Sequence, residues 1–351
     1  MPKLSRQGEY PLKSEENEDL VAIRSDMDYS RKFQTLRPVL VDRSGQRYLD
    51  FLKALKPSYV RVWADIALGY AALLATALAT AIAPRYGCPP WIATLGGALA
   101  VGFWVAYLQL FIHEGAHFNL AQGRETSDLL CDLLIAWMVG TSVQSYRPFH
   151  FQHHRALGQK DDSEMSYFFP LNLLFILKSL FGLRSIEVLS KRRTSAGKAR
   201  TTRETFLLLI GLSIHGTIVG ASFWFGFYTL GFAWILGIGM IFPFLGALRQ
   251  LLEHRDPNAD PHIDYFEQDH GAYTRVFGPS VFSSLFGAAG FDRHLLHHWE
   301  PQVSYTNLHQ LEAYLLDTDI APIIEMRRSS YIKTFLGLLR ADVIVTRNKT
   351  Q

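Results

Sequence analysis

Eight histidines stand in three short clusters of this 351-residue sequence. The clusters are HEGAH from His113 to His117, HFQHH from His150 to His154, and HLLHH from His294 to His298. Residues four apart on a helix lie on one face, about a turn apart, so the two histidines of the first cluster would face a common point. In each HxxHH cluster the first imidazole and one of the adjacent pair would converge while the adjacent pair diverges, so two nearby metal ions could share one cluster.

The number and type of these side chains indicate a metal centre with more than one ion. A catalytic zinc needs three protein ligands and a structural zinc four, and neither of the two cysteines, Cys88 and Cys131, lies near a cluster. Imidazole suits iron, copper and zinc alike, so the residues alone leave di-iron, di-copper and di-zinc open. Di-iron is favoured in a reducing cytosol, where Fe(II) can be kept ready for O₂.

The elements that must position the histidines are long apolar runs. Uncharged or nearly uncharged stretches run over Trp63–Ala83, Pro90–Ile112, Thr205–Leu230 and Gly231–Leu248. Each is long enough to cross a hydrocarbon core of roughly 30 Å as a helix, and they form two close pairs. We therefore expect two transmembrane hairpins rather than the buried helical core of a soluble protein.

Basic residues orient these hairpins. Of 35 Lys and Arg, all but Arg85 and Arg249 lie before Trp63, between His113 and Arg203, or after Leu252. The positive-inside tendency places all three of these segments in the cytosol. The expected fold is an all-α, multi-pass integral membrane protein with four transmembrane helices in two hairpins and a cytosolic helical cap that carries the histidine boxes. Its segments are the cytosolic N-terminus (1–62), the first hairpin (63–112), a cytosolic and interfacial segment with the first two boxes (113–204), the second hairpin (205–252) and the cytosolic C-terminus with the third box (253–351).

Several other features receive structural interpretations. The stretches Leu129–Val143 and Tyr167–Leu183 are too short or too interrupted to span, and we expect helices that lie at the interface. The basic run Lys191–Arg203 indicates a solvated face or a contact to anionic headgroups, and nucleic-acid binding is not favoured. The two cysteines fall on opposite expected sides of the membrane and should not pair. We see no signal peptide at the N-terminus.

Isolated histidines and membrane aromatics are expected to have structural roles. His215 lies inside the third span and should bond to a neighbouring helix. His262, His270 and His309 should be solvated or locally bonded. Trp104, Tyr107 and Trp137 should pack in the core or face lipid, with a substrate channel as the alternative.

The three boxes resemble in type, order and relative position those of the membrane fatty acid desaturase and hydroxylase family. The resemblance covers roughly Trp63 to Leu315 and includes the two-hairpin pattern. It implies two non-haem iron ions that activate O₂ to remove hydrogen from an unactivated C–H bond. It also implies nine iron ligands, namely His113, His117, His150, His153, His154, His254, His294, His297 and His298.

The family also suggests residues around the ligands. Many members have an amide residue four positions before the ninth histidine, where it holds a metal-bound water; Gln250 matches that place, although Asn is more usual there. An acidic pair after the second box matches Asp161 and Asp162. Glu114, inside the first box, is a candidate acceptor for the N–H of a ligand.

The sequence indicates the reaction and the substrate less specifically than it indicates the metal centre. FDRH before the third box departs from the usual acyl desaturases, so Asp292 and Arg293 are either substrate-facing or an ion pair. Desaturation of an acyl chain or related aliphatic substrate is preferred over hydroxylation and over desaturation of a polar, amino-acid-derived molecule of the rhizobitoxine enol-ether type. A membrane zinc hydrolase and a metal transporter or receptor are remoter alternatives. No haem-binding or cysteine-rich iron–sulfur segment occurs in the sequence, so electrons should come from a separate ferredoxin or cytochrome b5 type donor with its reductase.

Overall fold

The computed structural model describes residues 27–196 and 201–348, and within them only the backbone of 192–196 and 342–348. The described chain is built almost entirely from helices. Four helical stretches are long and apolar enough to cross a membrane: Tyr59–Tyr86, Pro90–Ala116, Thr202–Trp224 and Tyr228–His254. The expected all-α class with four spans is therefore confirmed.

Each span is built from one or more elements. The first consists of α4 (Tyr59–Ile82) and the short helix η1 (Ala83–Tyr86), and the second of α5 (Pro90–Gln109) and α6 (Phe111–Ala116). The third is α11 (Thr202–Trp224). The fourth joins α12 (Tyr228–Leu236), a π-helical turn η4 (Gly237–Ile241) and α13 (Phe242–His254).

The turn between the third and fourth spans differs from expectation. The sequence interpretation continued the third span to Leu230, whereas α11 ends at Trp224 and α12 begins at Tyr228. Gly226 lies between them with a φ of 75°, a left-handed conformation that glycine adopts without steric cost. Apolar character continues through this turn, so hydropathy alone did not reveal it.

The second and fourth spans also run further than expected. They reach Ala116 and His254 instead of Ile112 and Leu248, so their ends carry His113 and the ninth histidine. The rigid spans therefore position two of the nine candidate ligands directly.

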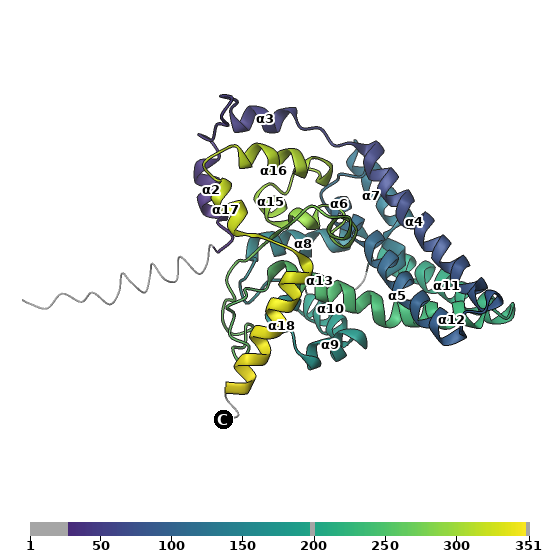
Figure 1. Ribbon diagram of the computed structural model, residues 1–351. Helices are drawn as coiled ribbons and strands as arrows, with labels where there is room; N and C mark the ends of the chain where they lie inside the picture. Colours follow the sequence, from purple (N-terminus) through teal and green to yellow (C-terminus); the bar gives the residue numbers. More distant parts are fainter. Residues whose placement is uncertain (1–26, 197–200, 349–351) are drawn as a thin grey trace, which may run out of the picture.

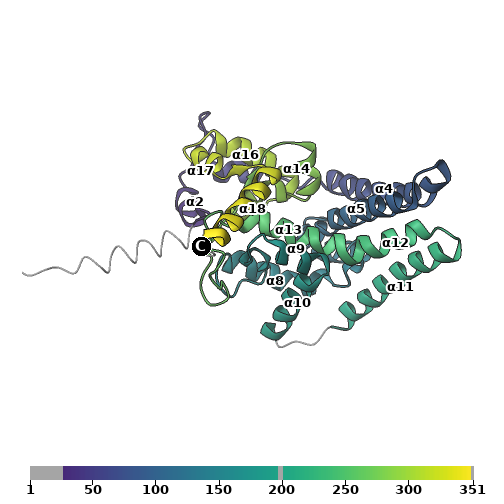
Figure 2. The ribbon, with the colours of Figure 1, turned by 60° about the horizontal axis from the view of Figure 1, so that its bottom comes forward.

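The second span is the centre of the helix bundle. Its α5 packs against α4 and against α12 and η4 of the fourth span, and all four spans extend toward one end of the molecule (Figures 1 and 2). At Gly102 the helices approach so closely that a Cβ atom would lie 2.5 Å from Ile241 Cβ and 2.8 Å from the Gly237 carbonyl oxygen. A glycine is needed here because the obstructing neighbours include backbone.

The remaining helices gather at the other end of the spans (Figure 1). Before the second box lie α7 (Arg124–Leu134) and η2 (Ala136–Val139), and α8 (Val143–Ala156) carries that box. Next come η3 (Ser166–Phe168), α9 (Leu173–Leu180) and α10 (Leu183–Ala196). After the fourth span follow β1 (Val276–Phe277), α14 (Val281–Phe286), η5 (Phe291–Arg293), α15 (His294–Trp299), η6 (Tyr305–Asn307), α16 (Leu308–Leu316), α17 (Ala321–Met326), β2 (Arg328–Ser329) and α18 (Tyr331–Asn348). Strands β1 and β2 form a two-residue parallel pair.

The N-terminal segment covers the helix of the third box. Its helices are α2 (Ser30–Leu36) and α3 (Tyr48–Ala54). Phe33 of α2 stacks on Trp299 with ring centroids 4.6 Å apart, and the indole N–H of Trp299 donates to the Asp28 carbonyl oxygen at 2.9 Å. Arg37 forms an ion pair with Glu300 at 2.5 Å. Sequence reasoning gave this segment no role, yet it packs directly on α15.

Three further expectations can be compared with the structure. The interfacial stretches form the short helices α7, η2 and α9, none of which is among the four spans. His215 bonds to neighbouring elements, because its Nε2 lies 3.0 Å from the Met138 carbonyl oxygen and its Nδ1 accepts from the Trp234 indole at 3.1 Å. Cys88 and Cys131 are both free. Residues 197–200 of the basic run lie outside the described residues.

Candidate metal centre

All nine candidate histidines meet at the junction of the spans and the cap. They come from four parts of the chain: α6 and the residue after it, α8, the last residue of α13, and α15. Their ring nitrogens fall into two groups. The five-histidine group contains His113, His117, His150, His154 and His297. The four-histidine group contains His153, His254, His294 and His298.

The five-histidine group brings Nε2 atoms of all three boxes together. The distance between Nε2 atoms is 2.8 Å from His113 to His297 and 2.8 Å from His117 to His150. It is 3.0 Å from His154 both to His150 and to His297. Helices α6, α8 and α15 are therefore linked through one cluster of imidazoles.

The four-histidine group adds the end of the fourth span. His294 Nε2 lies 2.9 Å from His254 Nε2 and 3.2 Å from His298 Nε2. His153 completes the group, and its side chain is 1% exposed. Within each group the ligand atoms all lie within 4.8 Å of one another.

Each of the two HxxHH boxes contributes histidines to both groups. His150 and His154, four apart, share the five-histidine group while His153 joins the other. His294 and His298 share the four-histidine group while His297 joins the first. The expectation that the adjacent pair diverges is confirmed, because neighbouring residues on a helix point about 100° apart.

The donor set fits metal ions. Burial lowers the pKa of the imidazoles outside the spans, namely His117, His154, His294, His297 and His298. These rings are therefore neutral near pH 7, and each can offer the lone pair that a metal needs. With a metal–nitrogen distance of about 2.0–2.1 Å, as for zinc and histidine, neighbouring ligand nitrogens around one ion lie roughly 3 Å apart. The observed separations of 2.8–3.2 Å agree with such an arrangement.

Hydrogen-bond acceptors next to the Nδ1 atoms orient several of the imidazole rings. Asp162 is fully buried, and its two carboxylate oxygens lie 2.9 and 3.0 Å from His153 Nδ1. Tyr167 donates its hydroxyl to the same carboxylate at 2.5 Å. His254 Nδ1 lies 3.1 Å from the Tyr273 carbonyl oxygen. Such acceptors hold the Nδ1–H tautomer and leave Nε2 for a metal.

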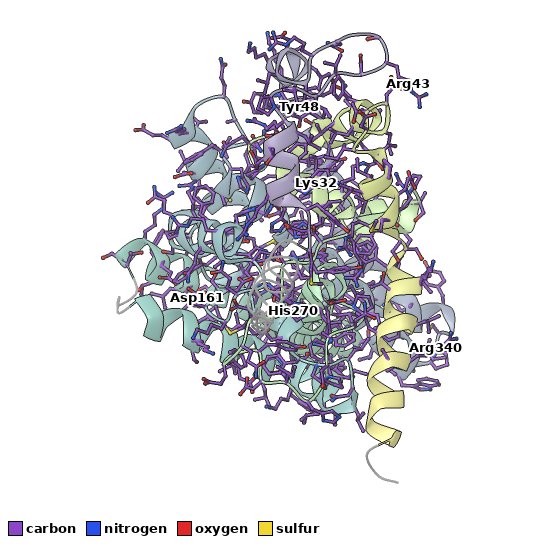
Figure 3. The ribbon with its side chains drawn as sticks, turned by 90° about the vertical axis from the view of Figure 1, so that its left-hand side faces the viewer. Lys32, Arg43, Tyr48, Asp161, His270 and Arg340 are labelled. Carbon is purple, nitrogen blue, oxygen red and sulfur yellow. The ribbon has the colours of Figure 1, made fainter. Side chains whose placement is uncertain are left out.

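The acidic candidates differ in position. Asp162 contacts His153, whereas the adjacent Asp161 is exposed (it is labelled in Figure 3), and its backbone oxygen accepts from the side-chain amide of Gln152 at 3.0 Å. Glu114 is buried beside the first box, with Oε1 3.6 Å from His113 Nδ1. Its other oxygen accepts from the backbone N–H of Tyr305 at 3.3 Å.

Glu164 is a site residue that sequence reasoning missed. Its Oε1 accepts from the Tyr146 hydroxyl at 3.2 Å and lies 3.6 Å from His150 Nδ1. Its Oε2 accepts from the Gln250 side-chain amide at 2.8 Å. The Gln250 oxygen in turn accepts from the Ser166 backbone N–H at 3.0 Å. The sequence signal was present, since Glu164 ends the acidic run that begins at Asp161.

Arg147 is a second missed residue, and it connects the first two boxes. Its guanidinium donates to the carbonyl oxygens of Gly115 and Ala116 at 3.0 and 2.8 Å. It also forms a close ion pair with Asp128. This arginine caps the end of α6 from the second turn of α8, so it sets the relative position of the two helices.

Asp292 and Arg293 form an ion-pair network. Their charged groups lie 2.6 Å apart, and Arg293 also pairs with Glu312 at 2.7 Å. Glu312 pairs with Arg328 at 2.8 Å. Burial raises the pKa of the Asp292 carboxyl to about 6. These contacts join the start of α15 to α16 and the β2 segment.

A helical protein with four membrane-length helices and two groups of converging, buried imidazoles belongs to the class of integral membrane metalloproteins. The family profile described as fatty acid desaturase matches residues 89–329. This range includes all nine candidate histidines. The chain belongs to this family. It is thus an oxidoreductase of the desaturase and hydroxylase type. No curated protein matches the chain.

Proposed function

We propose that the protein is an O₂-dependent di-iron desaturase that introduces a carbon–carbon double bond into an acyl chain or related aliphatic substrate. The observation that carries this proposal is the division of nine histidines into groups of five and four. The five- and four-histidine groups would each hold one iron ion. Two iron ions bound there would supply the oxidising power that removal of hydrogen from an aliphatic C–H bond requires.

The chain's own residues would bind, orient and shield this centre. Asp162 and the Tyr273 carbonyl fix rings of the four-histidine group, while Glu114 and Glu164 lie beside rings of the other. Seven of the nine side chains are 5% exposed or less, and the other two, His154 and His298, are partly exposed at the edge of the helix junction. Exclusion of water protects a reactive oxidant from side reactions.

A small apolar crevice of about 10 Å³, roughly the room of one water molecule, lies near the metal centre. Phe103, Tyr107 and Leu245 line it between α5 and α13, and Arg249 also contributes to its wall. Arg249 pairs with the buried Glu253 at 3.1 Å, and Glu253 Oε2 lies 3.9 Å from His294 Nε2. The crevice wall is therefore connected to the four-histidine group by one ion pair.

The hydrolase alternative is less well supported. One zinc ion with three ligands would leave at least one complete group of buried imidazoles with converging lone pairs. Hydroxylation remains the runner-up reaction, because the same ligand set serves either outcome. We propose that electrons come from a ferredoxin or cytochrome b5 type donor with its reductase, and that the site faces the cytosol, where the positive segments would lie.

The test is expression with a reductase system, followed by iron quantification and mass spectrometry of lipids and polar metabolites. Desaturation predicts a product lacking two hydrogen atoms, and hydroxylation predicts one added oxygen atom. His113→Ala and His294→Ala, one from each group, should each abolish the product and lower the iron content. His262→Ala is the matched control, since His262 is exposed and belongs to neither group. One tightly bound zinc without O₂ uptake would refute the proposal.

A further inference from the structure

A second cavity lies apart from the histidines, beside helices α9 and α10. Its volume is about 330 Å³, and none of the nine candidate ligands lines it. Its charged lining consists of three cations and one carboxylate, Lys178, Arg184, Lys191 and Glu187. Phe169 and Phe266 form aromatic walls. Among the residues that the structure describes, the lining therefore has an excess of positive charge.

The single lining carboxylate is shared between two of the cations. Glu187 accepts from Lys178 at 2.8 Å and from Arg184 at 2.5 Å. The Arg184 side chain is only 4% exposed, and its Nε–H is buried with no hydrogen-bond partner among the described residues. A buried, unsatisfied guanidinium N–H is costly, and an anion in the cavity would satisfy it.

Two of the cations also contact aromatic rings. The Arg184 guanidinium lies 3.4 Å from the Phe169 ring centroid, and the Lys191 ammonium lies 3.3 Å from that of Phe266. Asp264 and Glu267 act on Lys191 electrostatically, but neither lines the cavity. Burial lowers the pKa of both Arg184 and Lys191.

The outer surface of the same two helices is apolar. Their exposed large side chains, with the intervening turn, are Leu173, Leu174, Leu177, Phe181, Leu183, Ile186 and Leu189. Helices with one apolar face and flanking Lys and Arg lie in the membrane interface, at the depth of the headgroups. The basic cavity therefore lies next to a surface suited to lipid, and Figure 2 shows α9 and α10 beside α13 of the fourth span.

We propose that this cavity binds the phosphate of an anionic phospholipid and thereby holds the α9 and α10 hairpin on the membrane. The anion would pair with Lys191 and satisfy Arg184, while the acyl chains would lie along the exposed leucines. This inference is independent of the reaction proposed above, since no candidate metal ligand takes part. It gives a role to Lys191, the first residue of the basic run in the sequence.

The test uses the full chain, purified in neutral detergent and delipidated, with native mass spectrometry to measure retained lipid. Phosphatidylglycerol, phosphatidylcholine with the same acyl chains, and inorganic phosphate are the three probes. Wild type should retain phosphatidylglycerol in preference to phosphatidylcholine. Lys191→Gln should weaken phosphatidylglycerol binding about fivefold, as expected for one basic residue near a membrane surface.

A charge change of the opposite sign guards against loss of folding as the cause. Glu187→Gln removes the competing carboxylate and should strengthen phosphatidylglycerol binding about fivefold. Lys53→Gln is the matched control, because Lys53 is exposed on α3 and pairs with Asp50; it should change nothing. Equal retention of the two lipids, no effect of either cavity variant, or full competition by inorganic phosphate would each overturn the proposal.

Discussion

Replacement of Asp162 by Asn should weaken metal binding in the four-histidine group and leave the five-histidine group unchanged. Asp162 is fully buried and contacts His153 Nδ1 with both oxygens, at 2.9 and 3.0 Å. No ring of the five-histidine group has a hydrogen bond to it among the described residues. Asparagine keeps the shape but removes the negative charge that holds the His153 tautomer.

The expected size follows from the role of such acceptors. Loss of a carboxylate partner of a metal-bound histidine typically lowers metal affinity about 10- to 100-fold, which corresponds to about 1.4–2.7 kcal/mol. Tyr167→Phe should have a smaller effect, because it removes one of several hydrogen bonds to Asp162 and leaves its charge. The effect should appear in only one of two binding phases.

The assay is a metal titration of the apoprotein followed by absorption spectroscopy and metal quantification. Asp161→Asn is the matched control, since the neighbouring side chain is exposed and makes no contact with a candidate ligand among the described residues. Wild type and the control should bind in two phases of similar affinity, and Asp162→Asn should shift one phase. Equal weakening of both phases, or no weakening, would refute the assignment of His153 and Asp162 to one group.

Two further predictions concern stability, measured by chemical unfolding in detergent. Gly102→Ala should destabilise by about 1–3 kcal/mol, because the added Cβ overlaps η4, whereas Gly96→Ala, which meets nothing within 4 Å on the same helix, should be neutral or stabilising. Burial lowers the pKa of His270 to about 3, so on acidification the unfolded chain takes up this proton before the folded chain. Stability is then lost as the pH falls below about 6.5, by about 2 kcal/mol at pH 5. His270→Gln should lose about that much less than wild type between pH 7.5 and 5 (His270 is labelled in Figure 3); identical losses would contradict the buried neutral ring.

Much of the fold was predictable because it depends on local composition. Membrane-length apolar runs predict spans without knowledge of their partners, and all four are present. The turn at Gly226 and the extension of α6 and α13 were not predicted. Both depend on where backbone geometry changes within or just beyond an apolar run, and hydropathy does not report that.

Some features of the candidate site were also predictable from the sequence, and others were not. Helical periodicity predicts that the first histidine of an HxxHH box converges with one of the adjacent pair while that pair diverges. The structure confirms the divergence and shows that His154, not His153, joins His150. Arg147 could not be chosen from the sequence, because its importance comes from contacts with another helix. The acidic run pointed to the region of Glu164, but only its contact with Gln250 on the fourth span singles it out. Asp161 and Asp162 are equivalent by type and position, and only the path of the loop after α8 decides which one reaches a histidine.

By itself the sequence determined the number of spans, the histidine boxes and the kind of chemistry that nitrogen ligands support. Only the tertiary structure decided how nine histidines divide into groups of five and four. The physical reason is that spacing within one helix fixes directions over a few residues. The distances among α6, α8, α13 and α15 are set instead by packing of segments up to 184 residues apart, as between His113 and His297.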